Sequence, residues 1–228
     1  MNRLPLLDAE LWDRFPDPRQ ALAEPNGLLA FGGDLSPRRL LAAYSLGIFP
    51  WFGEHEPILW WSPDPRCVFH TETLRITRSL HRHLRGKSWR LTVDHAFDQV
   101  IRACADPRRP GSWIDRDIIA SYTELHRLGW VHSVEAWDGD ELAGGLYGVA
   151  IGGLFAGESM FHHQTDGSKA AVAGTIELLN DEYAADRVFD IQWVTDHLAT
   201  LGAVSIPRET YVRRVSAALD VPLPKAFT

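Results

Sequence analysis

The stretch "HSVEAWDGDELAGGLYGVAIGGLFAGESMF", residues 132–161, alternates apolar runs with two short turn signals. The first signal is Asp138-Gly139 and the second is Gly152-Gly153. Glycine is common in the tight turns between antiparallel strands, because it adopts a positive φ without steric cost. The pattern therefore predicts a three-stranded antiparallel meander.

The segments on either side of this meander predict a mixture of helices and short strands. Helices are expected at residues 34–47, 94–107, 116–129 and 169–183, and around Tyr211, Val215 and Leu219. Strands are expected near residues 67–69, 89–93 and 187–193. Because hairpins at the centre interrupt regular strand–helix alternation, the expected fold class is α+β and not a doubly wound sheet. A boundary near residues 63–66 would separate a small N-terminal domain, residues 1–64, from a second domain, residues 65–228.

Composition is typical of a globular protein. The chain has 228 residues, of which 45% are apolar and 23% charged. Cys67 and Cys104 fit neither a disulfide framework nor a CxxC metal site, which favours a reducing compartment. The N-terminus lacks the apolar run of a signal peptide, and no stretch approaches the ~20 apolar residues of a membrane span. We expect a soluble, cytoplasmic monomer with no membrane partner.

An aromatic segment, "GIFPWFGEHEPILWWSPDPR" at residues 47–66, combines three Trp and two Phe with four Pro. The prolines remove backbone donors and divide the segment into turns and short extended pieces. Two interpretations stay open at this point. The rings either plug the edge of the core or form a rigid platform on which a planar ligand, such as a nucleobase, stacks.

A basic segment at residues 73–93 contains no Asp or Glu, although the net charge of the chain is −7. Its cations are Arg75, Arg78, Arg82, Arg85, Lys87 and Arg90. The 3-4-3 spacing of the first four would place them on one face of a helix. A solvated face usually mixes both signs, so the missing acids favour a phosphate backbone as the counter-charge.

Standard catalytic patterns are mostly missing. "GESMF" departs from the GxSxG nucleophile elbow, and His162-His163 has no accompanying metal-binding pattern, which favours solvated histidines. Polar groups remain at the ends of apolar strands, namely Glu158, Asp190 and Gln192. In a strand, Asp190 and Gln192 would point to the same face. A carboxylate and an amide facing a cleft suit acyl transfer or amine binding, and structurally satisfied polar residues are the alternative.

Several long blocks of this sequence resemble the leucyl/phenylalanyl-tRNA–protein transferase family. They are "EPNGLLAFGGDLSPRRLLAAYSLGIFPWF", "PILWWSPDPR", "GGLYGVAIGGLFAGESMF", "SKAA" and "FDIQWVTDHLATLGAVSIPR", spread over residues 24–211. The resemblance implies transfer of Leu or Phe, with Met as a further donor, from aminoacyl-tRNA to the N-terminal Arg or Lys of acceptor proteins. That reaction marks the acceptors for degradation. The implied fold joins a small N-terminal domain to a domain like the Gcn5-related N-acetyltransferases, with a largely antiparallel mixed sheet.

The resemblance also implies roles for individual residues. Trp51 would line the site of the tRNA 3′-terminal adenosine, and Arg78, Arg82, Arg85 and Lys87 would contact the acceptor stem, with Trp113 beside it. Leu146, Phe155, Met160 and Val172 would line the pocket for the donor side chain, and Glu158, Asp190 and Gln192 would form the catalytic site. The family commonly has Asn where this chain has Thr195, which leaves the role of that position open.

The implied chemistry needs no cofactor, ATP or metal, because the ester of an aminoacyl-tRNA is already activated. We expect Asp190, acting through Gln192, to orient the acceptor amine and help remove its proton, while Glu158 positions the reactants. Whether Asp190 is a base or a substrate-binding carboxylate stays open. Two other functions are possible. One is a CoA-dependent N-acetyltransferase, but its pyrophosphate-binding motif is matched only in part by "QTDGSK" at residues 164–169. The other is a non-catalytic RNA-binding module, which would leave Asp190 and Gln192 without a role.

Overall fold

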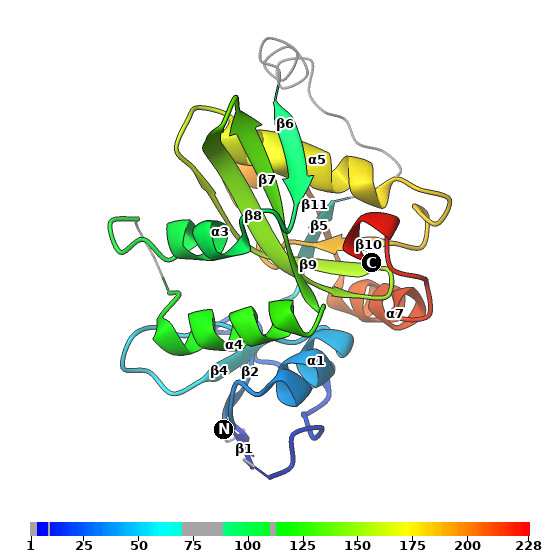
Figure 1. Cartoon of the computed structure of the whole chain (residues 1–228). Helices are drawn as coiled ribbons and strands as arrows, with labels where there is room; N and C mark the ends of the chain where they lie inside the picture. Colours follow the sequence, from blue (N-terminus) through cyan, green and yellow to red (C-terminus); the bar gives the residue numbers. More distant parts are fainter. Residues whose placement is uncertain (1–3, 9, 70–88, 110–112) are drawn as a thin grey trace.

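The computed structural model describes residues 4–8, 10–69, 89–109 and 113–228 (Figure 1). Within them, the chain forms two sheets surrounded by helices. The smaller sheet comes from the N-terminal quarter of the chain and the larger one from the remainder.

The smaller sheet has the strand order β1-β2-β4-β3. Its strands are β1 (Leu6–Leu7), β2 (Leu28–Gly32), β3 (Phe49–Pro50) and β4 (Leu59–Trp61), and helix α1 (Pro37–Ser45) follows β2. The aromatic segment supplies β3 and β4, in agreement with the short extended pieces expected for it. Pro50 lies on the edge strand β3, where a missing backbone N–H does not interrupt a central ladder.

The larger sheet has the strand order β11-β5-β10-β9-β8-β7-β6. Its strands are β5 (Arg66–Phe69), β6 (Arg90–Val93), β7 (Val131–Asp138), β8 (Glu141–Ile151), β9 (Leu154–His162), β10 (Val188–Asp190) and β11 (Val204–Ile206). Neighbouring strands are antiparallel except for β9 and β10, which run parallel. The expected meander is β7-β8-β9, with Gly139 and Gly152 at positive φ in its turns. The α+β class with a largely antiparallel mixed sheet is confirmed.

The described residues form five further helices. They are α3 (Phe97–Cys104), α4 (Arg116–Arg127), α5 (Gly167–Leu179), α6 (Asp196–Thr200) and α7 (Arg208–Ala218), with short 3-10 turns at Pro18–Gln20 and Lys225–Phe227. The residues expected to face inward do so: Ile118, Tyr122 and Leu125 of α4 are buried, as are Tyr211 and Val215 of α7.

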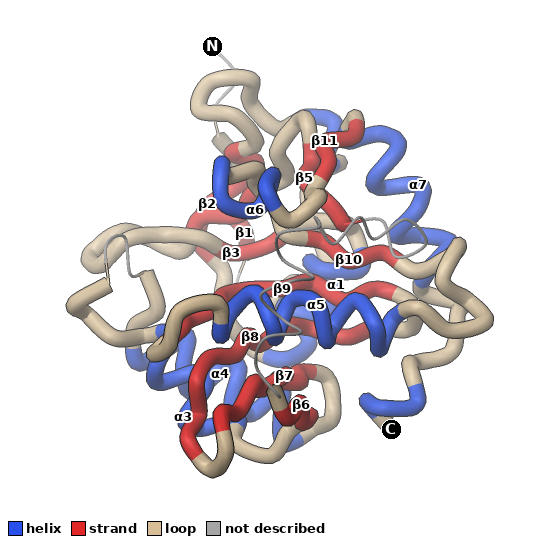
Figure 2. The backbone as a smooth tube through the Cα atoms, turned by 90° about the horizontal axis from the view of Figure 1, so that it is seen from above, coloured by secondary structure: helices blue, strands red, loops and turns tan. Residues whose placement is uncertain are grey.

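Two adjacent glycines of β8 show why helices can pack closely on both faces of the larger sheet. A Cβ on Gly144 would lie 2.4 Å from the backbone of Gly167, where α5 begins. A Cβ on Gly145 would lie 3.1 Å from the side chain of Val100 in α3. Because successive strand residues point to opposite faces, α5 and α3 cover opposite sides of β8. Figure 2 shows α5 running along β8 and β9.

The described residues form two apolar clusters. The larger cluster joins the N-terminal sheet and α1 to α3, α4 and α7, and the smaller lies between the larger sheet, α5 and the C-terminal Phe227. Arg208 of α7 donates hydrogen bonds to Asp64 Oδ1 and the Ser62 carbonyl, at 3.0 and 2.7 Å. The boundary expected between residues 64 and 65 stays a prediction. No helix in the described ranges combines the length and apolar character needed to cross a membrane.

Candidate functional site

A pocket of about 300 Å³ lies where the parallel pair of strands β9 and β10 ends. Pairing stops at Ala156 and Asp190, and β9 then continues to His162 without β10 beside it. The apolar part of the lining is Leu146, Met160, Val172, Phe189, Ile191 and Leu198. The polar part is Arg109, Glu158, Ser159, Gln192 and Thr195. The pocket thus combines apolar walls with a few polar groups, which is the usual composition of a small-ligand site.

Glu158 enters the pocket from a β-bulge. Tyr147 of β8 pairs with Ser159 and Gly148 pairs with Gly157, so Glu158 is the extra residue between them. A bulge redirects the side chain of the extra residue away from regular alternation, and bulges are common beside active sites. The sequence predicted Glu158 as a site residue, but the alternating pattern carries no sign of this bulge.

The carboxyl group of Glu158 is partly buried and hydrogen-bonded. Tyr122 Oη donates to Glu158 Oε2 at 3.2 Å, and Gln192 Nε2 donates to Oε1 at 3.3 Å. Tyr44 and Tyr122 share a hydrogen bond between their hydroxyls. The pKa of Glu158 is raised to about 8, mainly by burial and also by the nearby Asp190 carboxylate, while hydrogen bonds from Tyr44 and Tyr122 oppose the increase. Glu158 therefore changes charge close to neutral pH.

Asp190 lies beneath the pocket and is not part of its lining. Arg66 donates to both of its oxygens, with Nε–Oδ1 at 2.7 Å and Nη2–Oδ2 at 2.6 Å. Tyr211 Oη donates to Oδ2 at 2.9 Å, and the Gln192 backbone N–H donates to Oδ1 at 3.0 Å. The side chains of Arg66 and Asp190 are 1% and 0% exposed. Asp190 is thus the centre of a buried network.

Gln192 does not belong to the strand that carries Asp190. Strand β10 ends at Asp190, and Gln192 has φ +57°, in the left-handed region. The expectation that the two side chains project to one face of a strand was therefore wrong. A left-handed backbone is uncommon for a residue other than Gly and has to be held by its surroundings. Here the Asp190 carboxylate holds the Gln192 N–H, and the Gln192 amide reaches Glu158.

Three tryptophans gather at the edge of the pocket. The ring of Trp51 lies 5.7 Å from that of Trp61 and 5.3 Å from that of Trp193, both with edge-to-face geometry. Trp193 lines the pocket, and Trp51 is 41% exposed. Trp60, in contrast, is fully buried. Part of the aromatic segment therefore fills the core, and Trp51 presents an accessible ring beside the pocket; stacking of a planar ligand on that ring stays a prediction.

Comparison with known proteins shows which family the chain belongs to. Residues 68–216 match the profile "Leucyl/phenylalanyl-tRNA protein transferase", and residues 33–64 match that of its N-terminal domain. The chain belongs to the leucyl/phenylalanyl-tRNA–protein transferase family. The resemblance and the enzyme class expected from the sequence are thereby confirmed.

Relatives in this transferase family match almost the whole chain. The leucyl/phenylalanyl-tRNA–protein transferase of Anaeromyxobacter sp. (strain Fw109-5) is 54% identical over 211 residues, which are 91% of this chain and 88% of the relative. That of Shewanella woodyi is 49% identical over 227 residues, 98% of this chain and 94% of the relative. A solved structure from Bacteroides thetaiotaomicron VPI-5482, described as a conserved protein of unknown function, is similar to this chain with a TM-score of 0.43 and 9% sequence identity. The match covers 70% of this chain and 57% of that chain, and this likeness is too low to carry an argument.

Three of the four residues expected in the transferase donor pocket line the cavity. They are Leu146, Met160 and Val172. Phe155 does not line it, because it points into the smaller apolar cluster, where its ring lies 5.4 Å from Phe189 and 5.3 Å from Phe227. With the bulge at Glu158 included, Phe155 and Met160 lie on the same face of the sheet, so Phe155 misses the cavity because of its position further back along β9, beside Phe189 and Phe227.

The residues expected beside the tRNA acceptor stem have different outcomes. Arg78, Arg82, Arg85 and Lys87 lie outside the described residues. Trp113 is partly buried and packs against the larger apolar cluster. Thr195, where the resemblance implies Asn, is the N-cap residue that precedes α6: its Oγ1 accepts a hydrogen bond from Leu198 N at 3.2 Å, and the residue lines the pocket.

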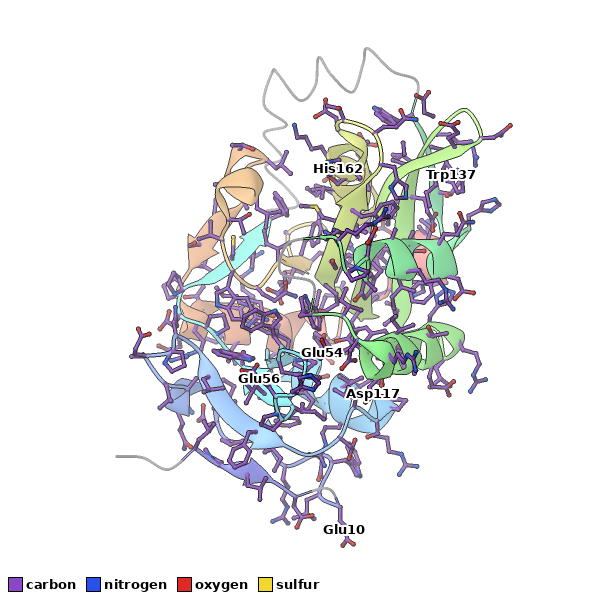
Figure 3. All side chains as sticks on the ribbon, turned by 90° about the vertical axis from the view of Figure 1, so that its left-hand side faces the viewer. Glu10, Glu54, Glu56, Asp117, Trp137 and His162 are labelled. Carbon is purple, nitrogen blue, oxygen red and sulfur yellow. The ribbon has the colours of Figure 1, made fainter. Side chains whose placement is uncertain are left out.

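Histidines 162 and 163 are exposed, as expected for solvated residues. Figure 3 shows His162 well separated from Glu54 and Glu56 of the loop between β3 and β4. Among the described residues, no group of three or more His, Cys, Asp or Glu side chains could hold a metal ion.

Proposed function

We propose that this protein transfers Leu or Phe from aminoacyl-tRNA to the N-terminal Arg or Lys of an acceptor protein. The observation that carries the proposal is the apolar pocket beneath Trp51, which contains one carboxyl group, Glu158, with a pKa of about 8. The names of the relatives agree with this activity. Degradation of the acceptors, a cytoplasmic location and a monomeric state belong to the same proposal.

The amino acid of the donor would enter between Leu146, Met160 and Val172. Their side chains offer apolar contacts without a directional requirement, which suits Leu, Phe or Met. Such a pocket separates substrates that differ by one methylene by only roughly 1–3 kcal/mol. The exposed ring of Trp51 would stack with the 3′-terminal adenine, an interaction of about 1–3 kcal/mol per base.

The reaction forms one C–N bond and breaks one C–O bond. The neutral acceptor amine attacks the ester carbonyl carbon, and the tetrahedral intermediate expels the ribose oxygen. One proton leaves the amine and one arrives on that oxygen, so the reaction needs no external oxidant, reductant or proton. The unperturbed pKa of an α-amine is roughly 7.7–8.0.

Glu158 is our candidate for moving this proton. Its pKa of about 8 is close to that of the amine, so the carboxylate can accept a proton and return it to the leaving oxygen without a large energy difference. Gln192 and Tyr122 would hold the carboxyl group in place through their hydrogen bonds to its two oxygens. These contacts support a proton-transfer role for Glu158 beyond the positioning role expected from the sequence.

Asp190 receives a supporting role in this proposal. Both of its oxygens already accept hydrogen bonds from a buried arginine, which leaves the carboxylate poorly placed to take a proton from a substrate. Its contact with the Gln192 backbone N–H supports a role in orienting Gln192. Arg78, Arg82, Arg85 and Lys87 remain the proposed contacts to the acceptor stem, on the basis of the sequence.

Mass spectrometry of a single reaction mixture tests the function. Purified protein is combined with Leu-tRNA, acetyl-CoA and a peptide that begins with Arg. The expected product is the peptide with one added leucyl residue, and a peptide with a blocked N-terminus should remain unchanged. An acetylated peptide would instead indicate a CoA-dependent N-acetyltransferase, and tRNA binding without any product would indicate an RNA-binding module.

A further inference from the structure

Arg109 is the only cationic side chain among the described residues that line the pocket. It follows α3 and lies against strand β9, next to the apolar wall formed by Met160. The expectations from the sequence gave it no role. A partly buried guanidinium in a pocket with mainly apolar walls needs a physical explanation, because an arginine usually places its charge in water.

Two backbone carbonyls hold Arg109 in place. Its Nη1 donates to the Cys104 carbonyl and its Nη2 to the Met160 carbonyl, each at 2.6 Å. These contacts join the end of α3 to β9. They also fix a long side chain before any ligand arrives, so less conformational entropy is lost when the guanidinium makes a further hydrogen bond.

Arg109 makes no direct ion pair within the described part of the chain, although the Asp106 carboxylate is near enough to interact with its charge through space. No ion pair joins it to a described carboxylate, whereas its neighbour Arg108 contacts Asp106 at 2.6 Å. Carbonyl oxygens accept hydrogen bonds but carry no net charge. A guanidinium has five N–H donors, and the two contacts to carbonyls leave others available. Arg109 is therefore a fixed cation without a direct ion-pair partner among the described residues, since the nearby Asp106 pairs directly with Arg108.

The chemistry of the proposed substrates limits what this cation can bind. The carboxyl group of the donor amino acid is esterified, and the α-amines of donor and acceptor carry positive charge when protonated. The side chains of Leu and Phe are neutral, and so are ribose and adenine. The nearest anion to the reacting ester is the phosphate attached to the 5′ oxygen of the terminal adenosine.

We propose that Arg109 binds this phosphate and thereby fixes the position of the 3′-terminal nucleotide at the pocket. The inference rests on the proposed function. A guanidinium pairs with phosphate oxygens through charge-assisted hydrogen bonds, which are stronger than neutral ones. Trp51 would hold the base, the apolar pocket the amino acid and Arg109 the phosphate, so three points would define the position of the ester carbonyl.

Two minimal donors test the proposal: leucyl-adenosine and the same molecule with a 5′-phosphate. In the unmodified protein, the KM for the phosphorylated donor should be lower than the KM for leucyl-adenosine by roughly tenfold or more, as expected for a hydrogen bond to a charged group. Added salt should reduce this advantage. Arg109→Gln should abolish the difference in KM between the two donors. Arg108→Gln is the matched control and should behave like the unmodified protein, because Arg108 is 89% exposed.

Equal losses with both donors in Arg109→Gln would assign Arg109 a purely structural role and overturn the proposal. If that variant fails to fold, the unmodified protein decides: equal KM values for the two donors also overturn it. Neither result affects the proposed function, which fails only if the unmodified protein transfers leucine from no donor at all, including intact Leu-tRNA.

Discussion

Arg66 and Asp190 are 124 positions apart in the sequence and form a two-point ion pair in the interior, at 2.7 and 2.6 Å. Arg66 begins β5 and Asp190 ends β10, and the two strands are antiparallel neighbours. Arg66 also donates to the Gly47 carbonyl at 3.1 Å, so the pair connects the aromatic segment to the strand that leads to Gln192. This arrangement explains why a carboxylate directly below the pocket is not available to substrate.

The first prediction concerns this pair. Asp190→Ala should lower the free energy of unfolding by about 3–5 kcal/mol, because it leaves the Arg66 guanidinium buried without a counter-ion. Arg66→Met should cost a similar amount. The double variant Arg66→Met/Asp190→Ala should cost clearly less than the sum of the two single losses, as urea denaturation of all three variants would show. Additive losses would mean that the two residues act independently.

The second prediction uses the raised pKa of Glu158. With leucyl-adenosine as donor, log(kcat/KM) should rise with a slope of about 2 between about pH 6 and pH 7 and level off near pH 8, because the acceptor amine and Glu158 both have to lose a proton. In Glu158→Gln only the amine titrates, so the slope should fall to about 1 and the rate should drop. An unchanged pH profile in this variant would exclude Glu158 as the group that moves the proton.

The same pKa has a consequence for stability that needs no substrate. The pKa of Glu158 is raised from its ordinary value of 4.5 to about 8, so in this interval the folded protein binds one more proton than the unfolded chain. The free energy of unfolding, relative to that of Glu158→Gln, should therefore fall as the pH rises from about 4.5 to about 8, and should be level above it. If the difference in the free energy of unfolding between the two proteins stays constant across this range, the pKa of Glu158 is not raised.

A third prediction separates the wall of the pocket from the packing behind it. Met160→Phe narrows the cavity, so it should reduce kcat/KM for Phe-tRNA more than kcat/KM for Leu-tRNA. The ratio of these two values should fall by roughly tenfold. Phe155→Leu is the matched control: it should lower thermal stability without changing the ratio, because Phe155 is buried in the smaller apolar cluster. A change of the donor ratio in the control would return Phe155 to the pocket.

A fourth prediction concerns the exposed tryptophan. Trp51→Ala should raise KM for leucyl-adenosine by roughly fivefold to 100-fold, the loss expected for one base stacked on a ring. Trp51→Phe should keep most of the affinity, since it retains a flat ring. Thermal unfolding should shift little in either variant because the side chain is 41% exposed. An unchanged KM in Trp51→Ala would remove the residue from the adenosine site.

Local signals were sufficient for most of the larger sheet and its helices. Glycine turns at Gly139 and Gly152 predicted the meander, and the spacing of Ile118, Tyr122 and Leu125 predicted α4 with its buried face. These features depend on neighbours within one or two turns of the chain, which a sequence displays directly. The order of the strands in the sheet cannot be predicted in this way, because it depends on contacts between segments that are distant in the sequence.

The candidate site was predictable as a set of residues but not as a geometry. Glu158 and Gln192 stood out because polar groups at the ends of apolar strands are costly without partners. The bulge at Glu158, the left-handed backbone of Gln192 and the partnership of Asp190 with Arg66 depend on tertiary contacts. The place of Trp193 at the pocket was not predicted, because nothing in the neighbouring sequence indicates that its ring contacts the ring of Trp51.

The central claim is that the pocket beside Glu158 holds the amino acid of an aminoacyl-tRNA. A crystal structure with a leucyl-adenosine analogue, in which an amide replaces the labile ester, tests this claim most directly. The account predicts the leucyl side chain between Leu146, Met160 and Val172, the carbonyl group next to Glu158 and Gln192, and the adenine against Trp51. Density for the analogue at another surface, with this pocket empty, would contradict it.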